Sequence, residues 1–141
     1  MIEPSEIQTV IFTHLHSDHI GNFDLFSNAE FYASAKEIED FKKDPLNTIL
    51  DKEAVERFNV ELKEIPEMIN GLEVINVPGH TRGSIALWHA VTKTLFSGDT
   101  LFHKGIYGRA DLPTSDHDSF RESLLKLEKY KFKVLCPGHD Y

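Results

Sequence analysis

The most constraining feature of this sequence is a block of four metal-ligand side chains within six residues: His14, His16, Asp18 and His19. The block directly follows the apolar run Val10–Phe12, which predicts a buried strand that ends there. Where strand geometry persists, His14 and His16 project from one face, because side chains alternate along a strand. The turn that follows would aim Asp18 and His19 at a second point close by.

Three further ligand-type residues share one arrangement, in which an apolar run is followed by Gly and then by the ligand: His80, Asp99 and His139. Glycine lets the backbone turn tightly and approach a site closely, and loops at strand ends are where sites are commonly assembled. A single histidine at a strand end is more often a hydrogen-bonded surface residue. The four-ligand block together with three such repeats favours a metal site.

The chemistry of these ligands limits which metal ions the site would bind. Imidazole and carboxylate groups suit zinc, iron or manganese, and the lack of thiolate ligands argues against a closed structural zinc site. Two metal ions close together would lower the pKa of a bound water, so that hydroxide forms at neutral pH. Asp18 and Asp99 would orient that water and carry its proton onward. The sequence therefore predicts a metal-dependent hydrolase.

The pattern between these residues alternates between strands and helices, which predicts one α/β layered domain over residues 1–141. Short strands are expected near Val10, Phe31, Val60, Leu72, Ile85, Thr94 and Val134. Asn70-Gly71 marks a turn between Val60–Leu62 and Leu72–Val74.

Helix signals lie between these strands. Ser34 should cap a helix over 35–43, with Glu37 completing a capping box, and residues 44–59 are weakly helical. The strongest helix should begin at Ser115, with one apolar side formed by Phe120, Leu124, Leu125 and Leu127.

Composition excludes several partners. The net charge is -8 and no basic stripe is present, which argues against nucleic acid, because binding to its backbone needs clustered Lys and Arg. No apolar run is long enough to cross a membrane, and no signal peptide is apparent. The single cysteine, Cys136, cannot form an internal disulfide, so we expect a cytoplasmic protein.

These motifs resemble the metallo-β-lactamase superfamily. The resemblance is carried by the His-x-His-x-Asp-His block, Pro78-Gly79-His80-Thr81, Gly98-Asp99 and Pro137-Gly138-His139, and it extends from about Thr9 to the end. It implies an αββα sandwich with two divalent metal ions, zinc most of all, at one edge of the sheets. It also implies a ligand set: His14, His16 and His80 on the first metal, Asp18, His19 and His139 on the second, and Asp99 bridging both.

Two segments, 97–102 and 108–113, look most like the glyoxalase II-related thioesterases, which implies hydrolysis of a thioester or related ester. The second is similar to a Gly-Arg-x-Asp motif of the related persulfide dioxygenases, where the Arg lies by the active site. Arg109 is therefore a candidate for binding an anionic substrate group. Its alternative is a structural ion pair with Asp111. His103 and Tyr107 are weaker candidates for the substrate pocket.

Two other functions stay open. The first is a mononuclear iron oxygenase like the persulfide dioxygenases, with iron on His14, His16, His80 and Asp99. The second belongs to another class: a shortened, catalytically inactive module that binds metal or acts as a scaffold. A nuclease is less favoured, because the chain is acidic.

One departure from the superfamily pattern bears on the scaffold. Relatives have several strands before the His block, which here begins at residue 14. We therefore expect a domain that is incomplete at its N-terminus and leaves apolar residues such as Ile11 and Phe12 short of neighbours. Such a chain should be a homo-oligomer or part of a larger protein.

Overall fold

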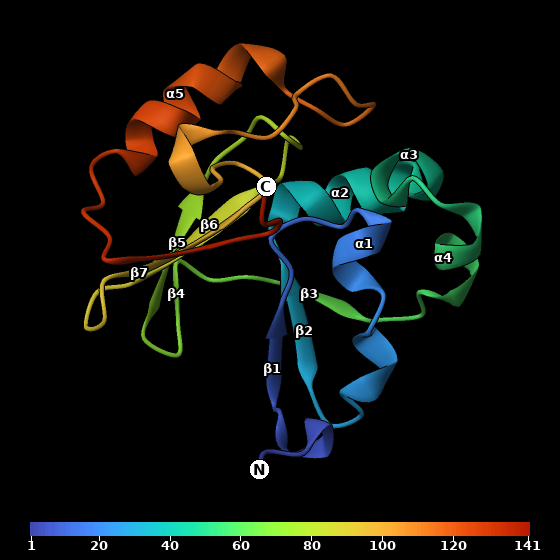
Figure 1. The fold of residues 1–141 in the computed structure, drawn as a ribbon. Coiled ribbons are helices and arrows are strands. Elements are labelled where there is room, and N and C mark those ends of the chain that lie inside the picture. Colours follow the sequence, from blue (N-terminus) through green and yellow to red (C-terminus); the bar gives the residue numbers. More distant parts are fainter. The chain divides into compact units, whose positions relative to one another are not determined.

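A computed structural model describes residues 1–141 and divides them into two units, Met1–Ile65 and Pro66–Tyr141. The first contains a three-stranded sheet with short helices, and the second contains a five-stranded sheet with one long helix (Figure 1). Each unit is α/β, as the alternating pattern indicates. That residues 1–141 form a single domain stays a prediction.

The sheet of the first unit is entirely parallel. Its strands follow in the order β1-β2-β3, with bounds Thr9–Ile11, Glu30–Ala33 and Leu62–Glu64. The register aligns Val10, Phe31 and Leu62 across the sheet, and this apolar row packs against the buried core of the unit. Ile11 and Phe12, expected to lack neighbours, are half-buried and buried, respectively.

Short helices complete the first unit. Their bounds are η1 Pro4–Glu6, α1 Ser17–Ile20, η2 Phe23–Leu25, α2 Ala35–Lys43, α3 Pro45–Ile49 and α4 Lys52–Arg57. Ser34 caps α2 by accepting a hydrogen bond from the Glu37 N–H, as predicted. The weakly patterned segment forms two helices because Leu50 takes a left-handed conformation, with φ of 66°, and ends α3.

The sheet of the second unit follows the order β4-β5-β6-β7-β8. The bounds of its strands are Met68–Ile69, Leu72–Asn76, Ile85–His89, Thr94–Gly98 and Val134–Pro137. Neighbours up to β7 are antiparallel, whereas β8 runs parallel to β7. The Asn70-Gly71 turn was expected to join the strand at Val60–Leu62 to the strand at Leu72–Val74, and this was wrong. The turn joins β4 to β5, whereas the strand that follows Val60, β3, pairs with β2.

The long helix α5, His117–Leu127, covers one face of this sheet, where Leu127 joins Ile75, Ala86 and Leu95 in the core.

Two details of the helix prediction were wrong. Asp116, not Ser115, is the N-cap, and Leu125 is 50% exposed while Leu127 is 1% exposed. Position 125 lies off the buried face because a helix turns about 100° per residue.

The other face of the same sheet is apolar and partly uncovered. Phe96 and Val134 lie on it, on neighbouring strands, with 37% and 48% of their surfaces exposed. The remaining short element of this unit is η3, His103–Gly105. None of the helices in the two units has the length and apolar character needed to span a bilayer.

We predict that two leucines of α5 differ sharply in their effect on stability. Leu127→Ala should lower the free energy of unfolding by about 2–5 kcal/mol, because it leaves a cavity in the core. Leu125→Ala, the matched control on the same helix, should cost about 0.5 kcal/mol or less. Urea denaturation followed by circular dichroism measures both. Equal losses would contradict the assigned helix face.

Candidate metal centre

The first ligand cluster lies where β1 leaves its sheet. The Phe12 N–H still donates to the Tyr32 carbonyl, at 2.9 Å, and the chain then turns toward α1, whose N-cap is His16. The ring centroid of His14 lies 4.7 Å from that of His16 and 4.2 Å from that of His19. Three imidazoles therefore gather within the first unit, although a turn rather than a continuing strand brings them together.

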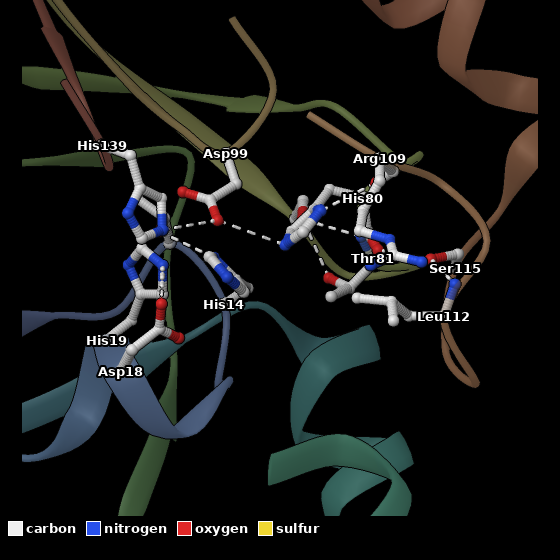
Figure 2. Close-up of polar contacts among 12 residues, drawn as sticks. His14, Asp18, His19, His80, Thr81, Asp99, Arg109, Leu112, Ser115 and His139 are labelled. Atoms are coloured by element: carbon white, nitrogen blue, oxygen red, sulfur yellow. Dashed lines mark hydrogen bonds and ion pairs between the residues drawn. The ribbon is translucent and has the colours of Figure 1, made fainter. Parts of the chain in front are cut away.

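The fourth member of this cluster, Asp18, lies in the first turn of α1. Its Oδ2 is 3.6 Å from His19 Nε2, and its side chain is 57% exposed. His14 and His16, in contrast, are buried. Figure 2 shows Asp18 directed toward the His19 ring. The first unit thus brings together all four members of the predicted block.

A buried carboxylate fixes the backbone between His14 and His16. Leu15 is fully buried in the core, and its N–H donates to Glu37 Oε1 at 2.9 Å. Glu37, which the sequence predicts to complete a capping box, ties α2 to the histidine block through this bond. Sequence reasoning missed this role, because the spacing from Ser34 to Glu37 is equally that of a capping box. The Thr13 hydroxyl lies 3.1 Å from His14 Nδ1, which directs Nε2 away from Thr13.

The second cluster lies in the second unit, at the ends of three strand segments. Asp99 follows β7, His139 follows β8 and His80 lies in the connection between β5 and β6. The segments that carry Asp99 and His139 approach each other closely at Gly98. Gly98 has φ of 55°, and its carbonyl accepts a hydrogen bond from the Gly138 N–H at 2.7 Å.

One carboxylate oxygen lies at the centre of this cluster. Asp99 Oδ2 is 3.3 Å from His80 Nε2 and 3.2 Å from His139 Nε2, and both rings point toward it (Figure 2). Asp99 and His80 are buried, and the side chain of His139 is 30% exposed. Two imidazole nitrogens converging on one carboxylate oxygen is a donor set that suits a divalent cation.

The loop that carries His80 is fastened to the start of α5. Its backbone carbonyls at Pro78, Gly79 and His80 accept hydrogen bonds from Ser123 Oγ, Asp116 N–H and Ser115 Oγ, respectively, at 2.7–2.8 Å. The Phe120 ring packs where a Cβ on Gly79 would lie, 2.7 Å from its Cγ. Ser115, predicted to start the helix, therefore holds the His80 loop, a role that no local sequence signal reveals.

The orientation of the His80 ring is also fixed. Its Nδ1 lies 2.8 Å from the Arg109 carbonyl oxygen, an acceptor, so Nδ1 carries the proton and donates. In the neutral ring Nε2 then has the lone pair, and Nε2 is the nitrogen that faces Asp99. Ligand histidines in metal sites are commonly held in this way by a backbone carbonyl.

The three predicted substrate residues differ in their surroundings. The Arg109 guanidinium pairs with Asp111 through two hydrogen bonds, of 2.6 and 3.0 Å, which raises the pKa of Arg109 and lowers the pKa of Asp111. This is the structural alternative that the sequence left open. Arg109 and Tyr107 line a groove of about 550 Å³ beside α5, whereas His103 lies in η3 and is exposed. The structure therefore brings Tyr107 and Arg109 together and leaves His103 apart.

Comparison with known proteins gives the family. A sequence profile of the metallo-β-lactamase superfamily matches residues 2–139. A probable metallo-hydrolase of Methanocaldococcus jannaschii is 41% identical over 145 residues, covering 99% of this chain and 60% of the relative. A hydroxyacylglutathione hydrolase of Methylobacillus flagellatus is 34% identical, covering 96% of this chain and 50% of the relative.

Solved structures share the fold. The crystal structure of TTHA1623 in a di-iron-bound form aligns with a TM-score of 0.75 at 24% identity, covering 94% of this chain and 70% of that one. A metallo-β-lactamase family protein from Thermus thermophilus, TTHA1429, aligns with a TM-score of 0.73 at 21% identity, covering 98% and 56%. Against a β-lactamase-like protein 2 homolog of Caenorhabditis elegans, the chain spans 43% of the relative. The match over 2–139 and the shared fold establish that this chain belongs to the metallo-β-lactamase superfamily.

Proposed function

We propose that the chain is a metal-dependent hydrolase that acts on a thioester or related ester. It would use two divalent metal ions, with zinc as the favoured metal. The observation that carries the proposal is the buried Asp99 carboxylate oxygen, 3.2–3.3 Å from Nε2 of two histidines. The similarity to hydroxyacylglutathione hydrolases supports the substrate class.

The donor set fits such ions, because it consists of imidazole and carboxylate groups. His14, His16 and His80 would hold the first ion, Asp18, His19 and His139 would hold the second, and Asp99 would be shared between them. When bound, the ions would lower the pKa of a water enough to give hydroxide at neutral pH, and they would polarise the substrate carbonyl. Asp99 and Asp18 would orient that water, and the exposed Asp18 would pass its proton to solvent.

The second part of the proposal concerns the residues that contact the substrate. We propose that Tyr107 and Arg109 contact the substrate through the groove beside α5, with the Arg109 guanidinium facing an anionic group while still paired with Asp111. His103 is the weakest candidate, because it does not line this groove. Location in the cytoplasm stays a proposal, supported by the single cysteine.

The metal proposal predicts an asymmetry between two aspartates. Asp99→Asn should lower the content of both ions, because the bridging charge is lost. Asp24→Asn, which removes an exposed carboxylate 3.4 Å from Arg57, should leave the metal content unchanged. Elemental analysis of protein purified without added metal measures both variants. Unchanged metal in Asp99→Asn would refute the bridging role.

The activity proposal predicts turnover of small-acyl thioesters of glutathione or coenzyme A by zinc-, manganese- or iron-loaded protein. Free thiol release is the readout, with Asp99→Asn as the inactive control. If no thioester is cleaved but oxygen is consumed with a persulfide by an iron-only protein, the chain is an oxygenase. Metal binding with neither reaction would favour the inactive module.

The chain spans about half the length of several relatives, and the apolar side chains of Phe96 and Val134 are exposed on one sheet face. We therefore propose that it works as a homo-oligomer or within a larger protein. Purified chain should self-associate in sedimentation velocity, and Phe96→Ser should weaken the association. A monomer with a cooperative melt that binds no hydrophobic dye would contradict this proposal.

A further inference from the structure

Residues 108 and 109 run directly against two of the proposed ligand loops. Leu101 and Tyr107 form an antiparallel bridge, and this turn brings the chain back to Asp99. The Gly108 N–H then donates to the Thr100 carbonyl, with 3.4 Å between nitrogen and oxygen. The carbonyl of the following residue, Arg109, accepts from His80 Nδ1. One short segment thus contacts both Asp99 and His80.

The contact at Gly108 leaves no room for a side chain. A Cβ built at this position would lie 1.9 Å from the Asp99 carbonyl oxygen and 3.5 Å from His80 Nδ1. The requirement is steric and not conformational, because Gly108 is absent from the positive-φ glycines Gly71, Gly98 and Gly105. Gly105, in the same loop, is the converse case: its φ is +72° and nothing lies within 4 Å of its added Cβ.

We propose that Gly108 is a positioning residue for the metal centre, and that its missing side chain lets the Arg109 carbonyl reach His80 Nδ1. The inference rests on the proposed metal-binding roles of His80 and Asp99. The backbone of residues 108–109 would thus position the metal ligands, in addition to the proposed role of the Arg109 side chain in binding substrate.

The physical reason lies in the two nitrogens of the neutral imidazole. While Nδ1 donates to the Arg109 carbonyl, the lone pair is held on Nε2, which faces Asp99 Oδ2 at 3.3 Å. If residues 108–109 move outward, the ring gains a second tautomer and freedom to rotate. Loss of such a supporting contact commonly weakens metal binding about 10- to 100-fold.

The test compares two glycine substitutions in one loop. Gly108→Ala forces the Asp99 and Arg109 backbones apart, and we expect zinc affinity, measured by chelator competition, to fall about 10-fold or more. In the same metal-free variant, ¹⁵N spectra of the histidine rings should show His80 losing its single Nδ1-protonated form. Gly105→Ala strains the backbone without touching Asp99 or His80, so it should lower the melting temperature but leave both readouts unchanged.

A second variant removes the acceptor without adding volume. Replacing Ala110 by lactic acid turns the Arg109 carbonyl into an ester carbonyl, a weaker acceptor, and it is informative even if Gly108→Ala does not fold. We expect the same change in the His80 spectrum and a smaller loss of zinc affinity.

Three results would overturn the inference: unchanged zinc affinity and His80 tautomer in Gly108→Ala, an equal loss in Gly105→Ala, or no effect of the ester. All the readouts are independent of thioester cleavage, so the absence of that activity would leave the test intact.

Discussion

The structure depends on a buried carboxylate that needs positive partners. Asp99 is 7% exposed, and burying an ionised carboxylate is costly unless cations or hydrogen-bond donors surround it. Its Oδ2 has an imidazole nitrogen on either side, from His80 and His139. Nε2 of neutral His80 faces this oxygen with its lone pair, so a divalent cation bound by these groups would supply the positive charge. The surrounding structure fixes the loops that carry them.

That fixing is done mostly by backbone groups. Three carbonyls of the 78–80 loop are tied to Ser115, Asp116 and Ser123, all at the start of α5 or within it. The Gly98 carbonyl holds the segment before His139. Hydrogen bonds to backbone carbonyls can place ligands precisely enough for metal coordination here because their donors, two serine hydroxyls and one N–H, lie on or beside the rigid helix α5.

The sequence predicted most strands, and it placed candidate ligands at their ends, because both signals are local. A ligand after an apolar run and a glycine can be recognised without knowing which strands pair, and β6 and β7 are neighbours in the sequence as well as in the sheet. The pairing of β3 with β2, across a long insertion of helices, could not be predicted in this way. Neither could the roles of Glu37 and Ser115, since each supports a ligand far away in sequence, at Leu15 and His80.

The two-metal site requires that the seven named side chains together bind two metal ions. A crystal structure of metal-loaded protein, with anomalous diffraction data at the absorption edge of the bound metal, tests this directly. We predict two anomalous peaks, each about 2.0–2.2 Å from its ligand atoms, with Asp99 coordinating both. A single ion, or ions bound only by residues of one unit, would contradict the two-metal assignment.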